Sequence, residues 1–297
     1  MMAATGKPAR LMLTDVASSG AVVDYARLDA RLEAVAREYP QAEPYPHVVL
    51  GEFLDPAVAR QVMQEFPPVD PSAWINYTHV NERKHGKSDR RSFPSTIGRV
   101  VDELNSPRFV AWLERLTGIA GLLADPSLEG GGLHQSARGG HVNIHADFTA
   151  HPHQSTWRRR VNLLVYLNEG WQDDYGGHLE LWSRDMKRCA RKILPTFNRA
   201  VVFDTGADTF HGHPEPMTCP AHVTRKSLAL YYFTAEARPF PVRSTEYRAR
   251  PGDGLRRAAI YLDKIALRGY HRAKRVLGLD DRWASRLLGL LSRLRGR

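Results

Sequence analysis

The stretch Val161–Leu167 reads VNLLVYL and Ser227–Phe233 reads SLALYYF, and these two apolar runs decide the fold. Both are rich in the branched, aliphatic and aromatic side chains that favour strands. Two shorter runs of the same kind, Leu179–Trp182 and Ala200–Phe203, lie between them. Gly, Pro, Asn and Asp separate these runs and no long helical pattern intervenes, so the sequence predicts an antiparallel sandwich or barrel.

Helical patterns precede this β region. We expect helices over residues 25–38 and 56–65, with a strand and turn over residues 46–54 between them. Residues 99–123 have a further helical pattern that is interrupted at Pro107 and ended by Gly118. Residues 67–98 are polar and are expected to be rich in loops.

The distribution of charge divides the chain into three parts. We expect an N-terminal extension over residues 1–45, a core domain over residues 46–240 and a basic helical tail over residues 241–297. The tail contains 15 Lys and Arg against 5 Asp and Glu, so it carries the whole net charge of +10. Any partner inferred from the basic composition is therefore a partner of the tail.

The composition limits the class of protein. In 297 residues, 42% are hydrophobic and 25% charged, as in an ordinary globular enzyme. No apolar run is long enough for a secretory signal or for the roughly 18 residues that span a bilayer. Cys189 and Cys219 are too few for a disulfide framework, so a reducing cytoplasm is the expected location.

The segment His141–Asp147, HVNIHAD, contains a candidate metal-binding pair. His145 and Asp147 are two residues apart, so on a strand both side chains point to one face. Two histidines and one carboxylate leave three positions open on Fe(II), as oxygen chemistry with a chelating co-substrate requires. The pair alone is weak evidence, because the chain contains 13 histidines.

With the motifs C-terminal to this pair, the sequence resembles the 2-oxoglutarate-dependent oxygenases of the prolyl 4-hydroxylase type over about residues 133–233. The matching elements are, in order, His145 and Asp147, Tyr166–Asn168, the glycine pair 176–177 before HLELW, PTFNRAVVF at 195–203, FHGHPEP at 210–216 and TRKSLALYYF at 224–233. The resemblance implies an α+β fold with a mainly β core. That core is a double-stranded β-helix, or jelly roll, with flanking N-terminal helices and a C-terminal helical tail.

The resemblance also implies a ligand set. His145, Asp147 and a later histidine would bind Fe(II), and the family spacing from Pro195 favours His211 over His213 for that third ligand. Arg225 occupies the position whose basic side chain anchors the distal carboxylate of 2-oxoglutarate.

Two further side chains are expected to line the co-substrate pocket. Tyr166 matches a family tyrosine whose hydroxyl binds the same distal carboxylate. Asn162 lies four residues earlier on the same strand face and could donate a second hydrogen bond, although both side chains could also be ordinary polar positions in a barrel interior.

The implied reaction is hydroxylation of an unactivated carbon by Fe(II), 2-oxoglutarate and O₂, with release of succinate and CO₂ and with ascorbate as a candidate reductant. The carboxylate of Asp147 favours hydroxylation over halogenation. The substrate, a peptide residue or a small molecule, is not determined by these motifs. Residues 148–160 are expected to border its entrance. Candidates for contact with the substrate, or for support of the ligands, are Gln135, Trp157, Arg159 and His213.

Two other classes of function are open from the sequence alone. One is a non-catalytic jelly-roll module for binding or sensing, and the other is a zinc-dependent hydrolase that uses the same ligands. An intact ligand set together with Arg225 argues against the first. Zinc hydrolases usually add a general-base glutamate, and Arg225 would have no role in one.

The tail has three interpretations. We expect one helix over residues 254–269, with Leu255, Ala259, Leu262 and Ala266 on its apolar face, and a second helix that begins near Asp280. The helices could pack on the barrel, lie on an anionic membrane surface as a peripheral anchor, or bind an acidic partner. No specific nucleic-acid module is recognisable.

Overall fold

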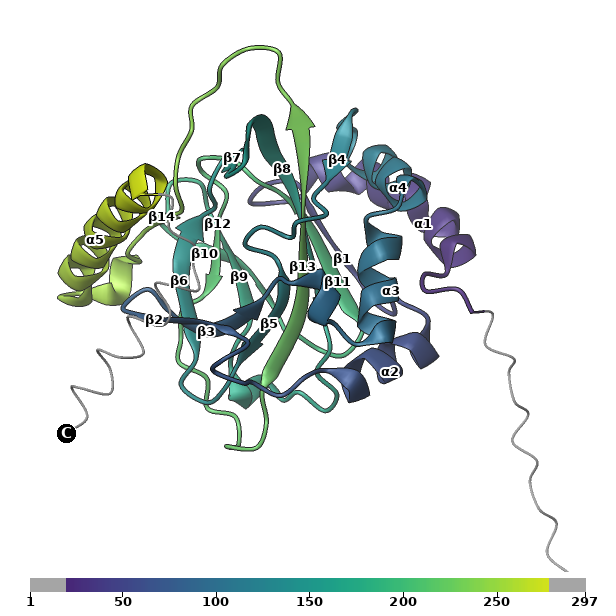
Figure 1. Ribbon diagram of the computed structural model, residues 1–297, viewed down its shortest axis with the longest axis horizontal. Coiled ribbons are helices and arrows are strands. Elements are labelled where there is room, and N and C mark those ends of the chain that lie inside the picture. Colours follow the sequence, from purple (N-terminus) through teal and green to yellow (C-terminus); the bar gives the residue numbers. More distant parts are fainter. Residues whose placement is uncertain (1–19, 278–297) are drawn as a thin grey trace, which may run out of the picture.

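In the computed structural model, which describes residues 20–277, fourteen strands form one curled antiparallel sheet with helices on two sides (Figure 1). The strands are β1 (His47–Leu50), β2 (Ile75–His79), β3 (Glu82–Lys87), β4 (Leu122–Ala124), β5 (Gly132–Ser136), β6 (His141–Ala146), β7 (Ala150–His151), β8 (Gln154–Tyr166), β9 (Leu179–Trp182), β10 (Cys189–Ile193), β11 (Arg199–Asp204), β12 (Phe210–His213), β13 (Arg225–Ala235) and β14 (Glu246–Tyr247). The path through the sheet is β1-β11-β8-β13-β5-β3-β6-β12-β9-β10. The predicted jelly roll is confirmed.

Five α-helices belong to the described part of the chain: α1 (Tyr25–Glu38), α2 (Pro56–Glu65), α3 (Ser95–Leu104), α4 (Pro107–Thr117) and α5 (Arg256–Leu277). Local sequence signals set their ends. Pro107 separates α3 from α4, since Ser106 caps α4 and Pro107 takes its first position. Gly118 then ends α4 in the left-handed conformation, with φ 71°.

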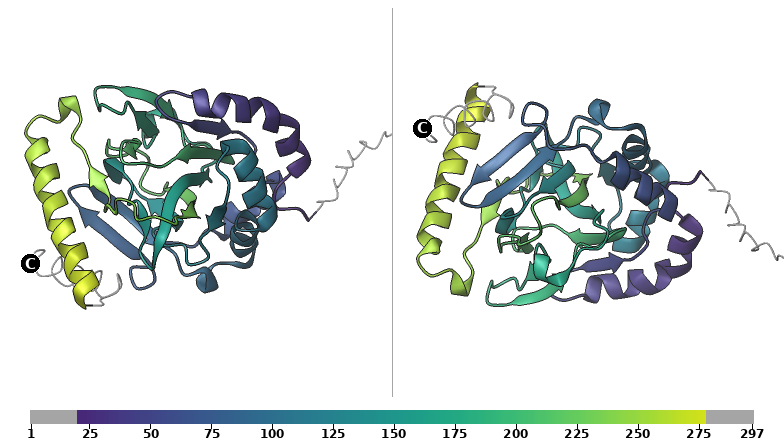
Figure 2. Two further views of the ribbon diagram at one scale, coloured as in Figure 1. Left: turned by 90° about the horizontal axis from the view of Figure 1, so that it is seen from above. Right: turned by 90° about the horizontal axis from the view of Figure 1, so that it is seen from below.

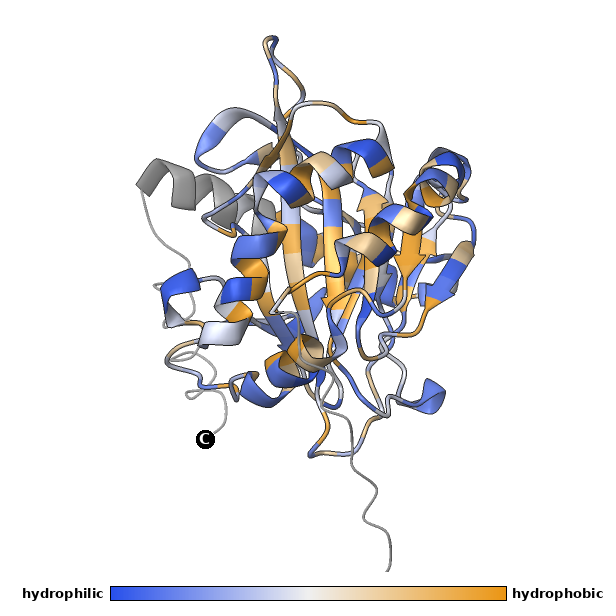
Figure 3. Ribbon diagram, turned by 90° about the vertical axis from the view of Figure 1, so that its right-hand side faces the viewer, coloured by the Kyte–Doolittle hydropathy of each residue, from blue (hydrophilic) through white to orange (hydrophobic). Residues whose placement is uncertain are grey.

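The main core lies between the sheet and the N-terminal helices. Residues of β8 alternate, so Val161, Leu163 and Val165 face the helices and pack with Ile97 and Phe109. The opposite face of β8 points into the barrel, where Tyr166 packs in a second, smaller cluster. Figure 3 shows hydrophobic strands behind helices whose outer sides are hydrophilic. The helical layer thus holds one face of the sheet and leaves the barrel interior for polar side chains.

The region expected to be loop-rich contains a hairpin that no sequence pattern indicated. Residues 75–87 form the β2–β3 hairpin, and β3 pairs with both β5 and β6. Its sequence, INYTHVNERKHGK, is polar on both faces, so no apolar alternation marks it as a strand pair. This hairpin closes the sheet between the two halves of the barrel.

The C-terminal part of the described chain packs on the barrel side opposite to α1 (Figure 2). Here β14 pairs with β6, and Glu246 accepts a 2.5 Å hydrogen bond from Lys264 of α5. The side chain of Asp263 accepts from Asn81 at 2.5 Å and contacts the His79 ring at 2.8 Å. No helix within residues 20–277 is long and apolar enough to cross a membrane.

The buried side of α5 is not the apolar face that its sequence indicated. Ile260 and Lys264 are buried, whereas Leu255 and Leu262 are 96% and 65% exposed. Hydrogen bonds and ion pairs instead anchor the inner side of α5. The predicted second helix near Asp280 lies outside the described residues.

Candidate metal centre

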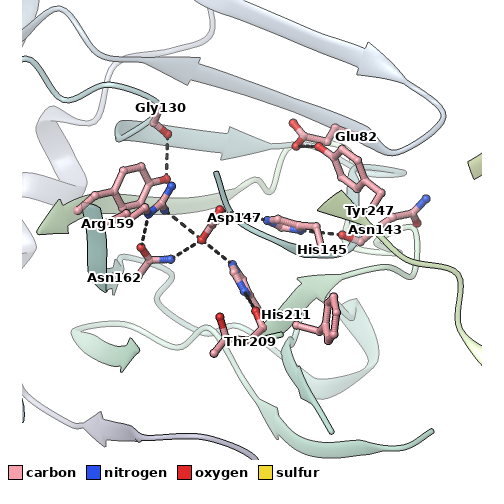
Figure 4. Close-up of polar contacts among 12 residues, drawn as sticks. Glu82, Gly130, Asn143, His145, Asp147, Arg159, Asn162, Thr209, His211 and Tyr247 are labelled. Atoms are coloured by element: carbon pink, nitrogen blue, oxygen red, sulfur yellow. Dashed lines mark hydrogen bonds and ion pairs between the residues drawn. The ribbon is translucent and has the colours of Figure 1, made fainter. Parts of the chain in front are cut away.

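Two antiparallel strands bring the candidate ligands together. His145 of β6 is paired directly with His211 of β12, and Asp147 comes directly after the end of β6. The Nε2 atom of His145 lies 3.6 Å from Asp147 Oδ1, and that of His211 lies 3.4 Å from Asp147 Oδ2. The ligand atoms of the three residues lie within 4.8 Å of one another, and Figure 4 shows them converging. Spacing of this kind suits one metal ion bound on one face.

The second nitrogen of each imidazole is tied to the backbone. His145 Nδ1 lies 2.8 Å from the carbonyl of Asn143, and His211 Nδ1 lies 3.2 Å from the carbonyl of Thr209. A carbonyl can only accept, so each Nδ1 must carry a proton and donate it. Each Nδ1 is thereby engaged with the backbone, so Nε2 is the nitrogen left to bind a metal ion.

Asp147 stays ionised despite burial. Burial opposes its charge, but the guanidinium of Arg159 and then the His211 ring hold the pKa of the carboxyl well below its usual range. Asp147 Oδ2 accepts a 2.8 Å hydrogen bond from Asn162 and lies 3.1 Å from Arg159 Nη2. The site therefore offers two imidazoles and one carboxylate, which fits Fe(II).

The side chain of Arg159 is fixed next to the carboxylate of Asp147. Its Nε donates to Asn162 Oδ1 at 2.9 Å, and its guanidinium carbon lies 3.4 Å from the centre of the Tyr231 ring and 4.5 Å from that of Phe148. Arg159 is 3% exposed, so little freedom remains for its side chain. The side chains of Arg159 and Asn162 thus fix one oxygen of Asp147 (Figure 4).

The two histidines in FHGH have different surroundings. Burial lowers the pKa of His211 to about 3, with Asp147 opposing the shift. His213 lies on the same strand after a register shift and is also buried, and burial followed by Arg225 holds its pKa well below the usual value. Within residues 20–277, His213 Nδ1 has no hydrogen-bond partner. The geometry brings His211, and not His213, to Asp147.

A buried cation lies deeper in the barrel. Arg225 is 6% exposed; its Nε donates to the carbonyl of Gly177 at 2.8 Å and its Nη2 to the Tyr166 hydroxyl at 3.3 Å. No carboxylate within residues 20–277 lies at ion-pairing distance from it. Gly177 has φ +69°, and a Cβ there would lie 3.0 Å from Arg225 Cδ, so glycine permits this approach. A buried guanidinium without an anion suits the carboxylate of a bound dicarboxylic acid.

The remaining predicted site residues make the following contacts. Asn162 is hydrogen-bonded to Asp147 and Arg159, and its predicted contact with the co-substrate stays a prediction. Trp157 packs on His151 and Phe233, with ring centroids 5.5 and 6.0 Å away. Gln135 donates to Thr224 Oγ1 at 2.7 Å.

Tyr247, which no sequence motif singled out, covers the metal-binding strand. Its ring centroid lies 5.5 Å from that of His145, and its hydroxyl bonds to the buried carboxylate of Glu82 (Figure 4). Tyr247 belongs to β14, in the region expected to be a separate tail. A lone tyrosine in a polar stretch carries no signal that could have indicated this contact.

The comparison with protein families agrees with this geometry. Residues 131–233 match the family described as the 2OG-Fe(II) oxygenase superfamily, and this range contains the three candidate ligands and Arg225. The chain carries a 2-oxoglutarate/Fe(II) oxygenase domain. Fe(II) and 2-oxoglutarate, which name the superfamily, were also the predicted metal and co-substrate, and this prediction is confirmed.

Individual relatives of the oxygenase domain are distant. A prolyl 3-hydroxylase of Mus musculus, OGFOD1, is 27% identical over 79 residues, which are 25% of this chain and 14% of the relative's length. A prolyl-4-hydroxylase structure from Pseudomonas putida is 18% identical with a TM-score of 0.48, covering 69% of this chain and 99% of that one. A prolyl hydroxylase from Trichoplax adhaerens, solved with a peptide of hypoxia inducible factor, is 18% identical with a TM-score of 0.49, covering 70% and 91%.

Proposed function

We propose that this chain is an Fe(II)- and 2-oxoglutarate-dependent dioxygenase that hydroxylates an unactivated carbon of a peptide or small molecule and releases succinate and CO₂. One observation carries the proposal. The same barrel that brings His145, Asp147 and His211 together also buries Arg225 without a carboxylate partner in the part of the chain that the structure describes.

The metal would be held by the Nε2 atoms of His145 and His211 and by one oxygen of Asp147. Asn162 and Arg159 occupy Asp147 Oδ2, so Oδ1 is the oxygen left to bind the ion. A carboxylate that binds through one oxygen leaves the three open positions that this chemistry uses. When bound, Fe(II) with 2-oxoglutarate and O₂ supplies the oxidising power to break an unactivated C–H bond, with ascorbate as a candidate reductant.

The distal carboxylate of 2-oxoglutarate would be bound by Arg225 and Tyr166. Arg225 Nη2 already lies 3.3 Å from the Tyr166 hydroxyl, so the two groups can contact one carboxylate together. Their burial removes competing water, and a charge-assisted hydrogen bond is stronger in such surroundings. The orphaned Nδ1 of His213 is buried near the same arginine and is available to a polar group of the co-substrate or substrate.

The test is substrate-free turnover. The protein is reconstituted anaerobically with Fe(II) and 2-oxoglutarate, exposed to O₂, and analysed for succinate. Succinate that requires all three components supports the proposal. No succinate, with 2-oxoglutarate binding retained, indicates the non-catalytic module, whereas hydrolysis of ester or amide substrates with Zn(II) and without 2-oxoglutarate indicates the hydrolase.

The outer face of α5 supports a further proposal about location. Tyr261, Leu262 and Ile265 of α5 are 58, 65 and 48% exposed, and Leu255 just before the helix is 96% exposed. Arg256 and Arg257 beside them are also exposed. Apolar side chains flanked by cations suit the surface of an anionic membrane, and an acidic protein is the alternative partner. We therefore propose a cytoplasmic enzyme that is peripheral at the membrane. Sedimentation with phosphatidylserine vesicles, but not phosphatidylcholine vesicles, tests this.

A further inference from the structure

A small cavity opens beside the candidate metal carboxylate. Its volume is about 130 Å³, and Asp147 forms part of its wall together with Phe148 and Phe240. We call it the mouth pocket and define it by its lining residues: Asp147–Thr149, Arg158 and Arg159, Thr205–Ala207, and Phe240, Pro241 and Arg243. Because Asp147 reaches both this pocket and the two histidines, a molecule in the pocket lies next to the metal centre.

The pocket has an excess of positive charge. Arg159 is paired with Asp147 at 3.1 Å, so these two charges offset each other. The exposed side chains of Arg158 and Arg243 have no ion-pair partner anywhere in residues 20–277. In addition, Arg159 Nη1 is buried and has no hydrogen-bond partner there. Two uncompensated cations therefore line a cavity that is large enough for only a small group.

The arginine from the C-terminal region is held in place by specific contacts. Thr149 Oγ1 donates to the carbonyl of Pro241 at 2.9 Å and accepts from the Arg243 amide at 2.9 Å. The Thr149 amide donates to the Arg243 carbonyl at 3.0 Å. These three hydrogen bonds fix the backbone at Arg243 against the segment just C-terminal to Asp147, so the pocket is part of the folded structure.

We propose that the mouth pocket binds an oxyanion of the substrate, a carboxylate or a phosphate, through Arg158 and Arg243. The inference rests on the proposed function and gives its substrate class. Guanidinium groups pair well with planar or tetrahedral oxyanions, and Phe148 and Phe240 add apolar surface to the wall of the pocket. The carbon to be hydroxylated then lies within a few bonds of the anionic group, since the cavity is small and adjoins Asp147.

The experiment uses the full chain and two matched pairs of probes. N-acetylglycine is compared with the neutral N-acetylglycinamide, and methyl phosphate with the neutral trimethyl phosphate. Binding is measured by saturation-transfer NMR, which needs no metal. Mn(II) is then added, with protein in excess over the metal and with saturating 2-oxoglutarate to occupy the site at Arg225. Broadening of the probe's resonances by the bound Mn(II) then shows that the probe lies near the metal and not at Arg225.

We expect at least one anionic probe to bind and its neutral partner not to bind. The variant Arg158→Gln/Arg243→Gln should weaken that probe about tenfold, because each exposed ion pair contributes a factor of roughly two to five. A matched control, Arg31→Gln/Arg37→Gln on α1, removes the same charge far from the pocket and should bind as the parent does. Comparing the affinities of N-acetylglycine and methyl phosphate shows whether the pocket prefers a carboxylate or a phosphate.

Equal binding of charged and neutral probes would overturn the inference. So would an anion preference that persists in Arg158→Gln/Arg243→Gln, or broadening that is absent when electron paramagnetic resonance shows that Mn(II) is bound. These results are separate from the fate of the proposed function. Whether the protein forms succinate does not determine whether it prefers the anionic probe, so the two results are read independently.

Discussion

At the scale of single residues, the metal ligands are the first to test. His145→Ala and His211→Ala should each abolish Fe(II)-dependent decarboxylation of 2-oxoglutarate, because each removes an Nε2 directed at Asp147. His213→Ala should retain measurable succinate formation. The measurement is succinate yield, with metal content determined for each variant. An inactive His213→Ala beside an active His211→Ala would show that the ligand assignment is wrong.

The co-substrate anchor gives a second residue-scale prediction. Arg225→Ala should weaken binding of 2-oxoglutarate roughly a hundredfold, since losing one partner of a buried charge pair costs on the order of 3 kcal/mol. Affinity for Fe(II) should change little. Lys226→Ala on the adjacent, partly exposed position is the control and should bind normally. Titration of 2-oxoglutarate into the Fe(II)-loaded protein checks both, and an unchanged affinity in Arg225→Ala excludes Arg225 as the anchor.

The roles of Arg159 and Asn162 were harder to infer from the sequence. Strand alternation correctly predicted that Asn162 and Tyr166 lie on the same face, but it did not indicate that Asn162 would contact Asp147. A bulge then leaves Arg160 unpaired between Val161 and Arg159. Because a bulge reverses which side chains point inward, Arg159 faces the barrel although strict alternation would turn it outward.

At the scale of elements, the close approach of β6 and β12 depends on Gly212. A Cβ at this position would lie 2.7 Å from the Val142 carbonyl oxygen and 2.9 Å from that of Asn143. Gly212→Ala should therefore push β12 away from β6 and separate His211 from His145. We expect at least tenfold weaker Fe(II) binding, because a three-ligand site loses most of its affinity when one ligand moves.

The control for this change is Gly206→Ala in the turn before β12. A Cβ there would lie 3.6 Å or more from its neighbours, which is ordinary contact. It should bind Fe(II) as the parent does. Equal affinity in Gly212→Ala and Gly206→Ala, measured by competition with a metallochromic chelator, would mean that the strand spacing does not set the metal site.

Elements with a clear apolar period were predicted well, and the others were not. The boundaries of α1 and α2 agree with the pattern of their sequences. The β2–β3 hairpin was missed because it lacks an apolar face. Periodicity indicated the apolar face of α5 but not its buried side, because polar anchors such as Asp263, whose partners lie about 180 residues away, cannot be recognised by periodicity.

At the scale of the whole molecule, the tail and the barrel are joined by β14 and α5. Deleting residues 241–297 should lower the melting temperature by several degrees and weaken Fe(II) binding, because it removes Tyr247 from His145 and leaves Glu82 buried without its hydroxyl partner. Val242→Ser, at a position that is 60% exposed in the same segment, is the control and should leave both unchanged. If the chain of residues 1–240 is fully stable and has lost only its binding to anionic vesicles, the tail is a membrane anchor and not a packed part of the barrel.

The pairing of β14 with β6 also has a consequence for how the protein is made. The ligands at positions 145, 147 and 211 leave the ribosome well before Glu246 and Tyr247, which pair with Ala146 and His145. During that interval one edge of the ligand-bearing strand is open to pairing with other chains. A chain that still lacks β14 therefore leaves this edge unpaired, so completion of translation protects the protein from misassembly.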